Sequence, residues 1–153
     1  SDANVDFVNS IGDYHDVAVY SEISTLNALV PTVVVDMAGN PEVLASVHAH
    51  FGESLKYSCS IGATHWDQTS HRVDISGPKP QFFFAPSQLS KRGKEWGRED
   101  LNNRLETALT TFIEGSKEWL RIEHSRGAGA VSETYSQLVA GKMPPEIGNI
   151  LSF

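Results

Sequence analysis

The side chains best suited to chemistry gather between residues 59 and 71, where Cys59, His65, Asp67 and His71 lie. A cysteine thiolate becomes a strong nucleophile when a base lies nearby, so Cys59 and His65 could form such a pair in a hydrolase. Cys59 lies inside an apolar run, however, and a buried cysteine usually behaves as a small hydrophobic residue. We therefore expect Cys59 to be structural.

A metal site would require several ligand side chains that converge on one point. His65, Asp67 and His71 form one candidate set, and His48 with His50 forms another. Neither spacing matches a strong metal signature. His48 and His50 would point to opposite faces of a strand, or roughly 200° apart on a helix. The sequence therefore predicts no metal site.

The elements that position these residues alternate between helix and strand, which is typical of an α/β fold with a parallel sheet. Gly12, Gly52 and Gly141 are expected to end helices, while Asn40 and Pro41 are expected to begin one. An almost continuously apolar, β-branched run favours a strand that is buried on both faces. We predict helices at about 1–11, 41–51, 88–96, 98–117 and 131–139, strands at 17–20, 31–37, 55–61, 81–86, 119–123 and 150–153, and loops at 67–80 and 127–129. The helix at 98–117 carries a regular apolar stripe that we expect to face the core.

Ligands of an open parallel sheet bind beyond the carboxyl ends of its strands. Here those ends are predicted at Tyr20, residues 36–40 and residues 62–65. Gly39 and Gly62 either let the backbone approach a bound group or are simply turn glycines, and both readings stay open. The Gly-rich phosphate loop of a dinucleotide fold is missing, because the string at 127–129 lacks a third glycine and follows an alternating strand.

Composition limits the partners of the chain. Twelve Lys and Arg against 19 Asp and Glu give a net charge of −7, which disfavours nucleic-acid binding. The basic run at 91–94 is expected to be a solvated face. No apolar run approaches the ~18 residues of a membrane helix, and no leader is recognised. With only one cysteine, the sequence predicts a soluble cytoplasmic protein that does not engage membranes.

Several strings in this order resemble the cofactor domain of the medium-chain dehydrogenase/reductase superfamily, in its quinone-reductase branch. Residues 1–20, 31–39 and 55–64 are similar to successive parts of that domain, and residues 109–153 resemble the C-terminal return segment. The strings at 35–40, 56–58, 62–66 and 83–88 resemble an uncharacterised offshoot of the superfamily, a domain of unknown function.

The resemblance implies an incomplete Rossmann-like parallel sheet with flanking helices, lacking the first strand and the phosphate loop. The chain would then be a C-terminal fragment of a longer protein. Residues 1–66 would be the C-terminal part of a dinucleotide-binding domain, residues 67–80 a loop, and residues 81–153 the last strand and helices with the return segment.

The resemblance also implies cofactor-binding residues, with NADP as the cofactor. Ser1 and Asn4 would lie near the adenosine ribose, where an acidic residue such as Asp2 would instead favour NAD. Tyr20 would flank the adenine. The nicotinamide half would be lined by Ala38, Gly39, Gly62, Ala63 and Thr64. No catalytic residue is assigned, and the sequence does not decide whether His65 or Tyr57 would donate a proton.

Two functions follow as expectations. The parent would be an NAD(P)H-dependent oxidoreductase that passes hydride to a small-molecule carbonyl, enone or quinone, while the fragment alone, without a phosphate loop, would be inactive. The alternative is a non-catalytic ligand-sensing or interaction module on the same fold. An uncovered sheet edge or face in the fragment would also favour self-association.

Overall fold

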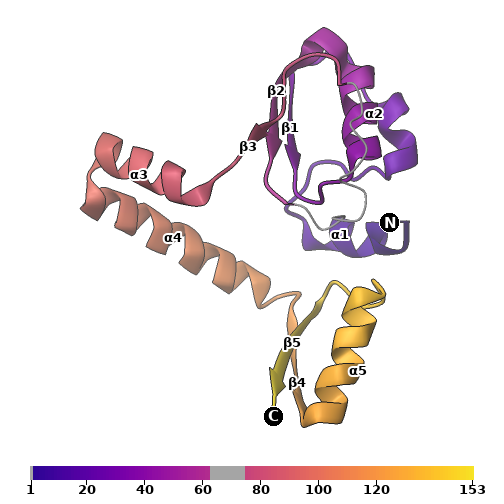
Figure 1. Cartoon of the computed structure of the whole chain (residues 1–153), viewed down its shortest axis with the longest axis vertical. Coiled ribbons are helices and arrows are strands. Elements are labelled where there is room, and N and C mark those ends of the chain that lie inside the picture. Colours follow the sequence, from indigo (N-terminus) through magenta and orange to yellow (C-terminus); the bar gives the residue numbers. More distant parts are fainter. Residues whose placement is uncertain (1, 63–74) are drawn as a thin grey trace. The chain divides into compact units, whose positions relative to one another are not determined.

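The computed structural model describes residues 2–62 and 75–153, and it divides the chain into two compact units, Ser1–Glu95 and Trp96–Phe153. Each unit contains a small parallel sheet, with strand order β1-β2-β3 in the first and β4-β5 in the second (Figure 1). The predicted α/β class and parallel pairing are confirmed, and the arrangement is consistent with a partial Rossmann-like fold. The predicted segment boundaries at 66 and 80 stay a prediction.

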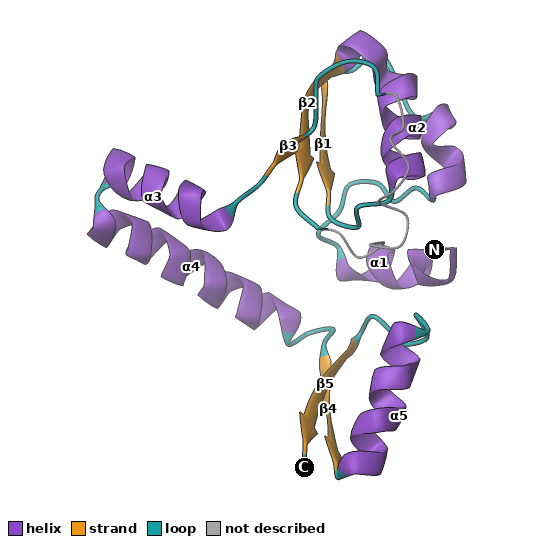
Figure 2. Cartoon of the chain, in the orientation of Figure 1, coloured by secondary structure: helices purple, strands orange, loops and turns teal. Residues whose placement is uncertain are grey.

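The first unit places helices against a three-stranded sheet (Figure 2). The chain enters it through the 3₁₀ turn η1 and the short helix α1, which ends at Gly12 as predicted. Val33 pairs with Tyr57, and Val35 pairs with Cys59. Its elements are η1 (Asp2–Asn4), α1 (Val5–Ile11), η2 (Tyr20–Thr25), β1 (Thr32–Asp36), α2 (Pro41–Phe51), η3 (Gly52–Ser54), β2 (Leu55–Ser60), β3 (Gln81–Phe82) and α3 (Ala85–Trp96), the last of which reaches the unit boundary.

Helix α2 begins and ends where the sequence predicts. The Asn40 side chain accepts hydrogen bonds from the backbone N–H groups of Glu42 and Val43, and Pro41 occupies the first turn. At the other end Gly52 takes a φ of +49°, which a residue with a Cβ rarely adopts.

The core of the first unit lies between α2 and one face of its sheet. Its buried apolar members are Ile23, Leu44, Leu55 and Cys59. The prediction that residues 31–37 form a strand buried on both faces is wrong, because Val33 and Val35 remain 58% and 50% exposed. A β-branched apolar run indicates that a strand forms, but it does not determine what covers the second face.

Two predicted strands of this unit differ from the structure. Residues 17–20 form no strand, because Val19 and Glu22 close a tight turn at the start of η2, where the Val19 N–H donates to Glu22 Oε2 at 3.1 Å. The strand predicted at 81–86 is confined to Gln81–Phe82, and α3 begins at Ala85, earlier than predicted.

The second unit is a βαβ arrangement preceded by a long helix. It contains α4 (Arg98–Ser116), β4 (Arg121–Arg126), α5 (Ala128–Val139) and β5 (Ile147–Ser152). β4 and β5 pair in parallel from Arg121 with Ile147 to Arg126 with Ser152. The loop predicted at 127–129 is wrong beyond Gly127, because α5 begins at Ala128.

Helix α4 was expected to bury its apolar stripe, and it does not. Residues 102–115 are all exposed, and only Leu101 and Ser116 of this helix are buried. The apolar spacing predicted the helix itself correctly, within one residue at its end. In the described ranges, no helix combines the length and the apolar character that a membrane span needs.

Candidate functional site

The carboxyl ends of β1 and β2 meet at a close backbone contact. The N–H groups of Ile61 and Gly62 both donate to the Asp36 carbonyl, at 2.9 and 3.3 Å. A Cβ on Gly62 would lie 1.7 Å from the carbonyl oxygen of Met37, which is impossible without moving backbone. Gly62 therefore allows a close approach, but the group that approaches is the chain's own Met37.

Gly39 lies in a turn that the Asp36 carboxylate closes. Asp36 Oδ1 accepts from the backbone N–H of Ala38 at 3.1 Å and from that of Gly39 at 2.8 Å. Gly39 has a φ of +70°, which makes it a turn glycine. Asn40 Oδ1 accepts from the N–H groups of Glu42 and Val43, so four backbone donors around this turn already have partners inside the chain.

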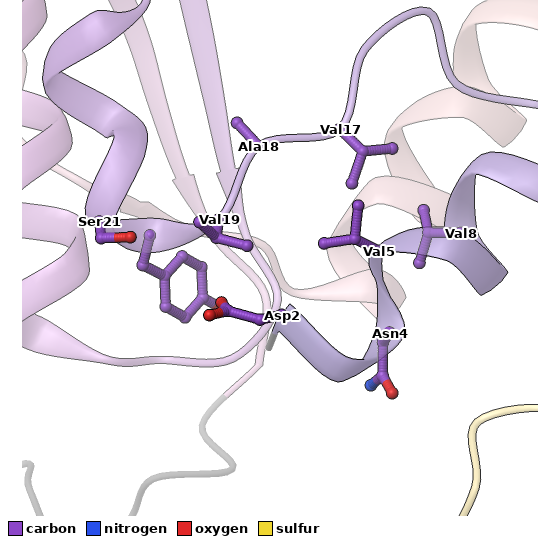
Figure 3. Close-up of a pocket in the computed structure, with 9 residues that line it drawn as sticks. Asp2, Asn4, Val5, Val8, Val17, Ala18, Val19 and Ser21 are labelled. Carbon is purple, nitrogen blue, oxygen red and sulfur yellow. The ribbon is translucent and has the colours of Figure 1, made fainter.

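A pocket of about 360 Å³ lies between α1 and the start of η2. The side chains of Val5, Val8 and Val17 point toward one another, and that of Asn4 points away from them (Figure 3). The pocket is lined by Asp2, Asn4, Val5, Val8, Val17, Ala18, Val19, Tyr20 and Ser21. It brings together Asn4 and Tyr20, two of the residues predicted to hold the adenosine half.

A second pocket of about 310 Å³ lies beside the carboxyl end of β1 and is mainly apolar. Its lining consists of Tyr20, Ile23, Val34, Val35, Asp36, Met37, Ala38, Val43, Leu44 and Val47. Tyr20 lines both pockets, whereas Asn4 lines only the first and Ala38 only the second. Gly62 lies against Met37 of this lining. We call these two neighbouring pockets the Tyr20 groove.

Of the remaining predicted residues, Gly39 and Gly62 line neither pocket. Ser1, Ala63 and Thr64 lie outside the described residues, and so do His65, Asp67 and His71. The hydrolase and metal hypotheses that use His65 therefore stay predictions. Cys59 is buried, as expected.

The stretch of sequence that lines the groove is acidic. Residues 2–55 contain no Lys or Arg, and Asp2 lines the first pocket itself. The same stretch contains eight carboxylates, at Asp2, Asp6, Asp13, Asp16, Glu22, Asp36, Glu42 and Glu53. A phosphate group would meet unfavourable charge here unless another part of the protein supplies cations.

Sequence reasoning missed a buried hydrogen-bonded histidine. The side chains of His48 and Ser58 are completely buried, with His48 Nε2 2.9 Å from Ser58 Oγ. His48 Nδ1 lies 2.7 Å from the Ser76 carbonyl, which can only accept. The network therefore assigns the proton to Nδ1, and Nε2 accepts from the Ser58 hydroxyl.

This Ser–His pair has the connectivity of an activated nucleophile, but it lies where a substrate has no access. Its effect is structural, since it ties α2 and β2 to the segment at Ser76. The available sequence signal was the spacing of four residues between Leu44 and His48, which places His48 on the apolar face of the helix.

His48 and His50 do not converge on a common point. His50 Nε2 instead contacts the Leu26 carbonyl at 2.9 Å. Among residues 2–62 and 75–153, no three side chains of the metal-binding types gather.

The comparisons with known proteins give one match. A family model described as "Protein of unknown function (DUF2855)" matches residues 1–144. No curated protein and no solved structure matches the chain.

Proposed function

We propose, from the premise that this chain belongs to the DUF2855 family of proteins of unknown function, that its full-length protein binds a nicotinamide dinucleotide along the Tyr20 groove. The activity that we propose is hydride transfer between NADP(H) and a small carbonyl, enone or quinone. The protein would contribute binding and orientation, and the bound nicotinamide would supply the hydride chemistry.

The observation that carries this proposal is the position of the groove. It runs from Asn4 past Tyr20 to Ala38, at the carboxyl end of β1 in a parallel sheet. Ligands of open α/β sheets bind at this edge. The groove also has apolar walls with a few polar groups at its end, which suits a planar heterocycle and its ribose.

The described residues fit the adenosine half of the cofactor and do not fit its pyrophosphate. The N–H groups of Ala38 and Gly39 donate to Asp36, and those of Glu42 and Val43 donate to Asn40. A pyrophosphate is normally held by backbone N–H groups at a helix N-terminus. The proposal therefore requires that residues outside the described ranges hold the phosphates.

A titration with the full-length protein tests the proposal. NADPH and NADH are added separately, and quenching of tryptophan fluorescence reports binding. Tyr20→Ala should weaken binding about tenfold, because an aromatic contact is worth roughly 1.4 kcal/mol. Tyr14→Ala is the matched control, since Tyr14 is as exposed as Tyr20 and lines neither pocket.

Binding of neither nucleotide at millimolar concentration would refute the proposal. Equal losses for Tyr20→Ala and Tyr14→Ala would refute the placement in the groove. If NADH binds more tightly than NADPH, binding stands and the choice of NADP is wrong, as the carboxylate of Asp2 in the pocket would explain.

The second candidate is a non-catalytic ligand-sensing or interaction module. It is favoured by the internally bonded backbone donors around Asp36 and Asn40, which leave an apolar groove without a phosphate cradle in the described part. Oxidation of NADPH, followed by absorbance with enones and quinones as acceptors, separates the two. Binding without turnover of any acceptor would favour the module.

A further inference from the structure

Helix α4 exposes an apolar stripe along its middle. Leu105, Leu109, Phe112 and Ile113 are between 45% and 65% exposed, while charged side chains occupy other sides of the helix. Packing of an apolar face supplies most of the stability of a helix in a protein. The exposed stripe from Leu105 to Ile113, about 12 Å long on this helix of 19 residues, therefore calls for a partner.

We propose that this partner is α4 of a second copy, packed antiparallel about a two-fold axis that passes between Ala108 and Leu109. This surface lies outside the Tyr20 groove and does not depend on the proposed function. The sequence had suggested self-association through an uncovered sheet, and the structure offers this helix as a better defined surface.

The stripe reads almost the same from both ends, as a two-fold contact requires. A half-turn about the axis sets Leu105 opposite Phe112 of the second copy and Ala108 opposite Leu109. At the centre each large side chain thus faces a small one, which lets two helices approach to about 8–10 Å.

Charge complementarity also favours a second copy. Glu99 and Lys117 are 18 residues apart, which is five turns, so they lie on the same side of α4 beside the stripe. The half-turn brings Glu99 of each copy close to Lys117 of the other, giving one opposite-charge pair at each end. Antiparallel packing also sets the two helix dipoles against each other favourably.

The first test is the mass of the full chain in sedimentation equilibrium, measured without nucleotide. We expect a reversible dimer whose dissociation constant rises at least tenfold in Leu109→Glu. Thr110→Glu is the matched control, because it adds the same charge on the adjacent residue, which points away from the stripe, and it should leave the dimer unchanged. A chain that stays monomeric at all concentrations would overturn the proposal, as would equal effects of the two variants.

Cross-linking tests the antiparallel geometry directly. With a short bismaleimide, chains carrying Ala108→Cys should cross-link to each other. Chains carrying Glu99→Cys should not, because their cysteines would lie about 28 Å apart along the axis, but they should cross-link when mixed with Lys117→Cys chains. The unmodified chain is the blank, since Cys59 is buried. Efficient cross-linking of Glu99→Cys to itself would show parallel packing and refute the proposal.

Charge reversal supplies an independent check. Lys117→Glu should weaken the dimer about threefold, and the double variant Glu99→Lys/Lys117→Glu should recover the loss. In the double variant only the pair between copies regains opposite charges. Inside the chain, the ion pair of Lys117 with Glu114, at 2.7 Å, is replaced by two carboxylates in both variants. Failure of the double variant to recover would contradict the proposed register.

Discussion

At the scale of single residues, Gly62 is a position with no room for a Cβ. The Cβ of an alanine at this position would overlap the Met37 carbonyl, which is a backbone group. We predict that Gly62→Ala destabilises the protein by about 3 kcal/mol, because β1 and β2 must separate at their carboxyl ends. Urea unfolding followed by circular dichroism measures this.

The control for that variant is Gly129→Ala. Gly129 lies in α5, has open space around it and has an ordinary negative φ. Alanine is the better helix former, so this variant should gain up to about 1 kcal/mol. If both variants shift stability in the same direction, the backbone contact at Gly62 is not the cause.

The buried pair of His48 and Ser58 gives a second prediction at this scale. His48→Ala removes two hydrogen bonds and leaves the Ser58 hydroxyl and the Ser76 carbonyl without their partner. We expect a loss of about 3 kcal/mol in the free energy of unfolding, because unsatisfied buried groups cost more than the bonds are worth. His50→Ala, which removes one contact to Leu26, should cost about 1 kcal/mol. Similar losses for both would contradict the structural role of His48.

At the scale of elements, the cap of α2 is the testable feature. Asn40→Ala removes both side-chain bonds to the first turn and should cost about 1 kcal/mol, whereas Asn40→Asp keeps an acceptor there and should cost much less. Thermal unfolding of the two variants compares them. An alanine variant as stable as the aspartate variant would show that the cap contributes nothing.

Local signals predicted most of the elements. Asn40, Pro41 and Gly52 marked the ends of α2, and the spacing of apolar residues marked α4, because capping and periodicity depend only on neighbouring residues. The same signals failed at Val19, where a side-chain contact from Glu22 favours a turn over a strand. They also failed for the exposed face of β1, since coverage of a face depends on distant parts of the chain.

The candidate site shows the same limit. Family resemblance named Asn4, Tyr20 and Ala38, and in the structure Asn4 and Tyr20 line one pocket while Tyr20 and Ala38 line another. The resemblance could not predict that the side chains of Asp36 and Asn40 accept hydrogen bonds from the neighbouring backbone N–H groups, because the partner of a side chain is set by the local turn geometry. The His48–Ser58 contact joins residues ten positions apart on two different elements, and no short sequence pattern predicts it.

At the scale of the whole molecule, charge is unevenly distributed. All Lys and Arg residues follow Leu55, so the groove belongs to an acidic part of the chain. We predict that Asp2→Asn strengthens NADPH binding about threefold more than NADH binding, because the 2′-phosphate adds negative charge near this carboxylate. The gain should shrink in high salt.

Asp13→Asn is the control for this charge effect, because it removes the same charge from a residue that lines neither pocket. Titrations at low and high ionic strength compare the two variants. An equal gain from Asp13→Asn would place the effect in the general field of the protein and not at the pocket.

Hydrogen exchange in the full-length protein, with and without saturating NADPH, tests the central claim most directly. If the dinucleotide occupies the Tyr20 groove, backbone amides at residues 17–25 and 36–40 should exchange at least several-fold more slowly when it is bound, while those of α5 stay unchanged. Binding that protects other segments and leaves these two untouched would contradict the account.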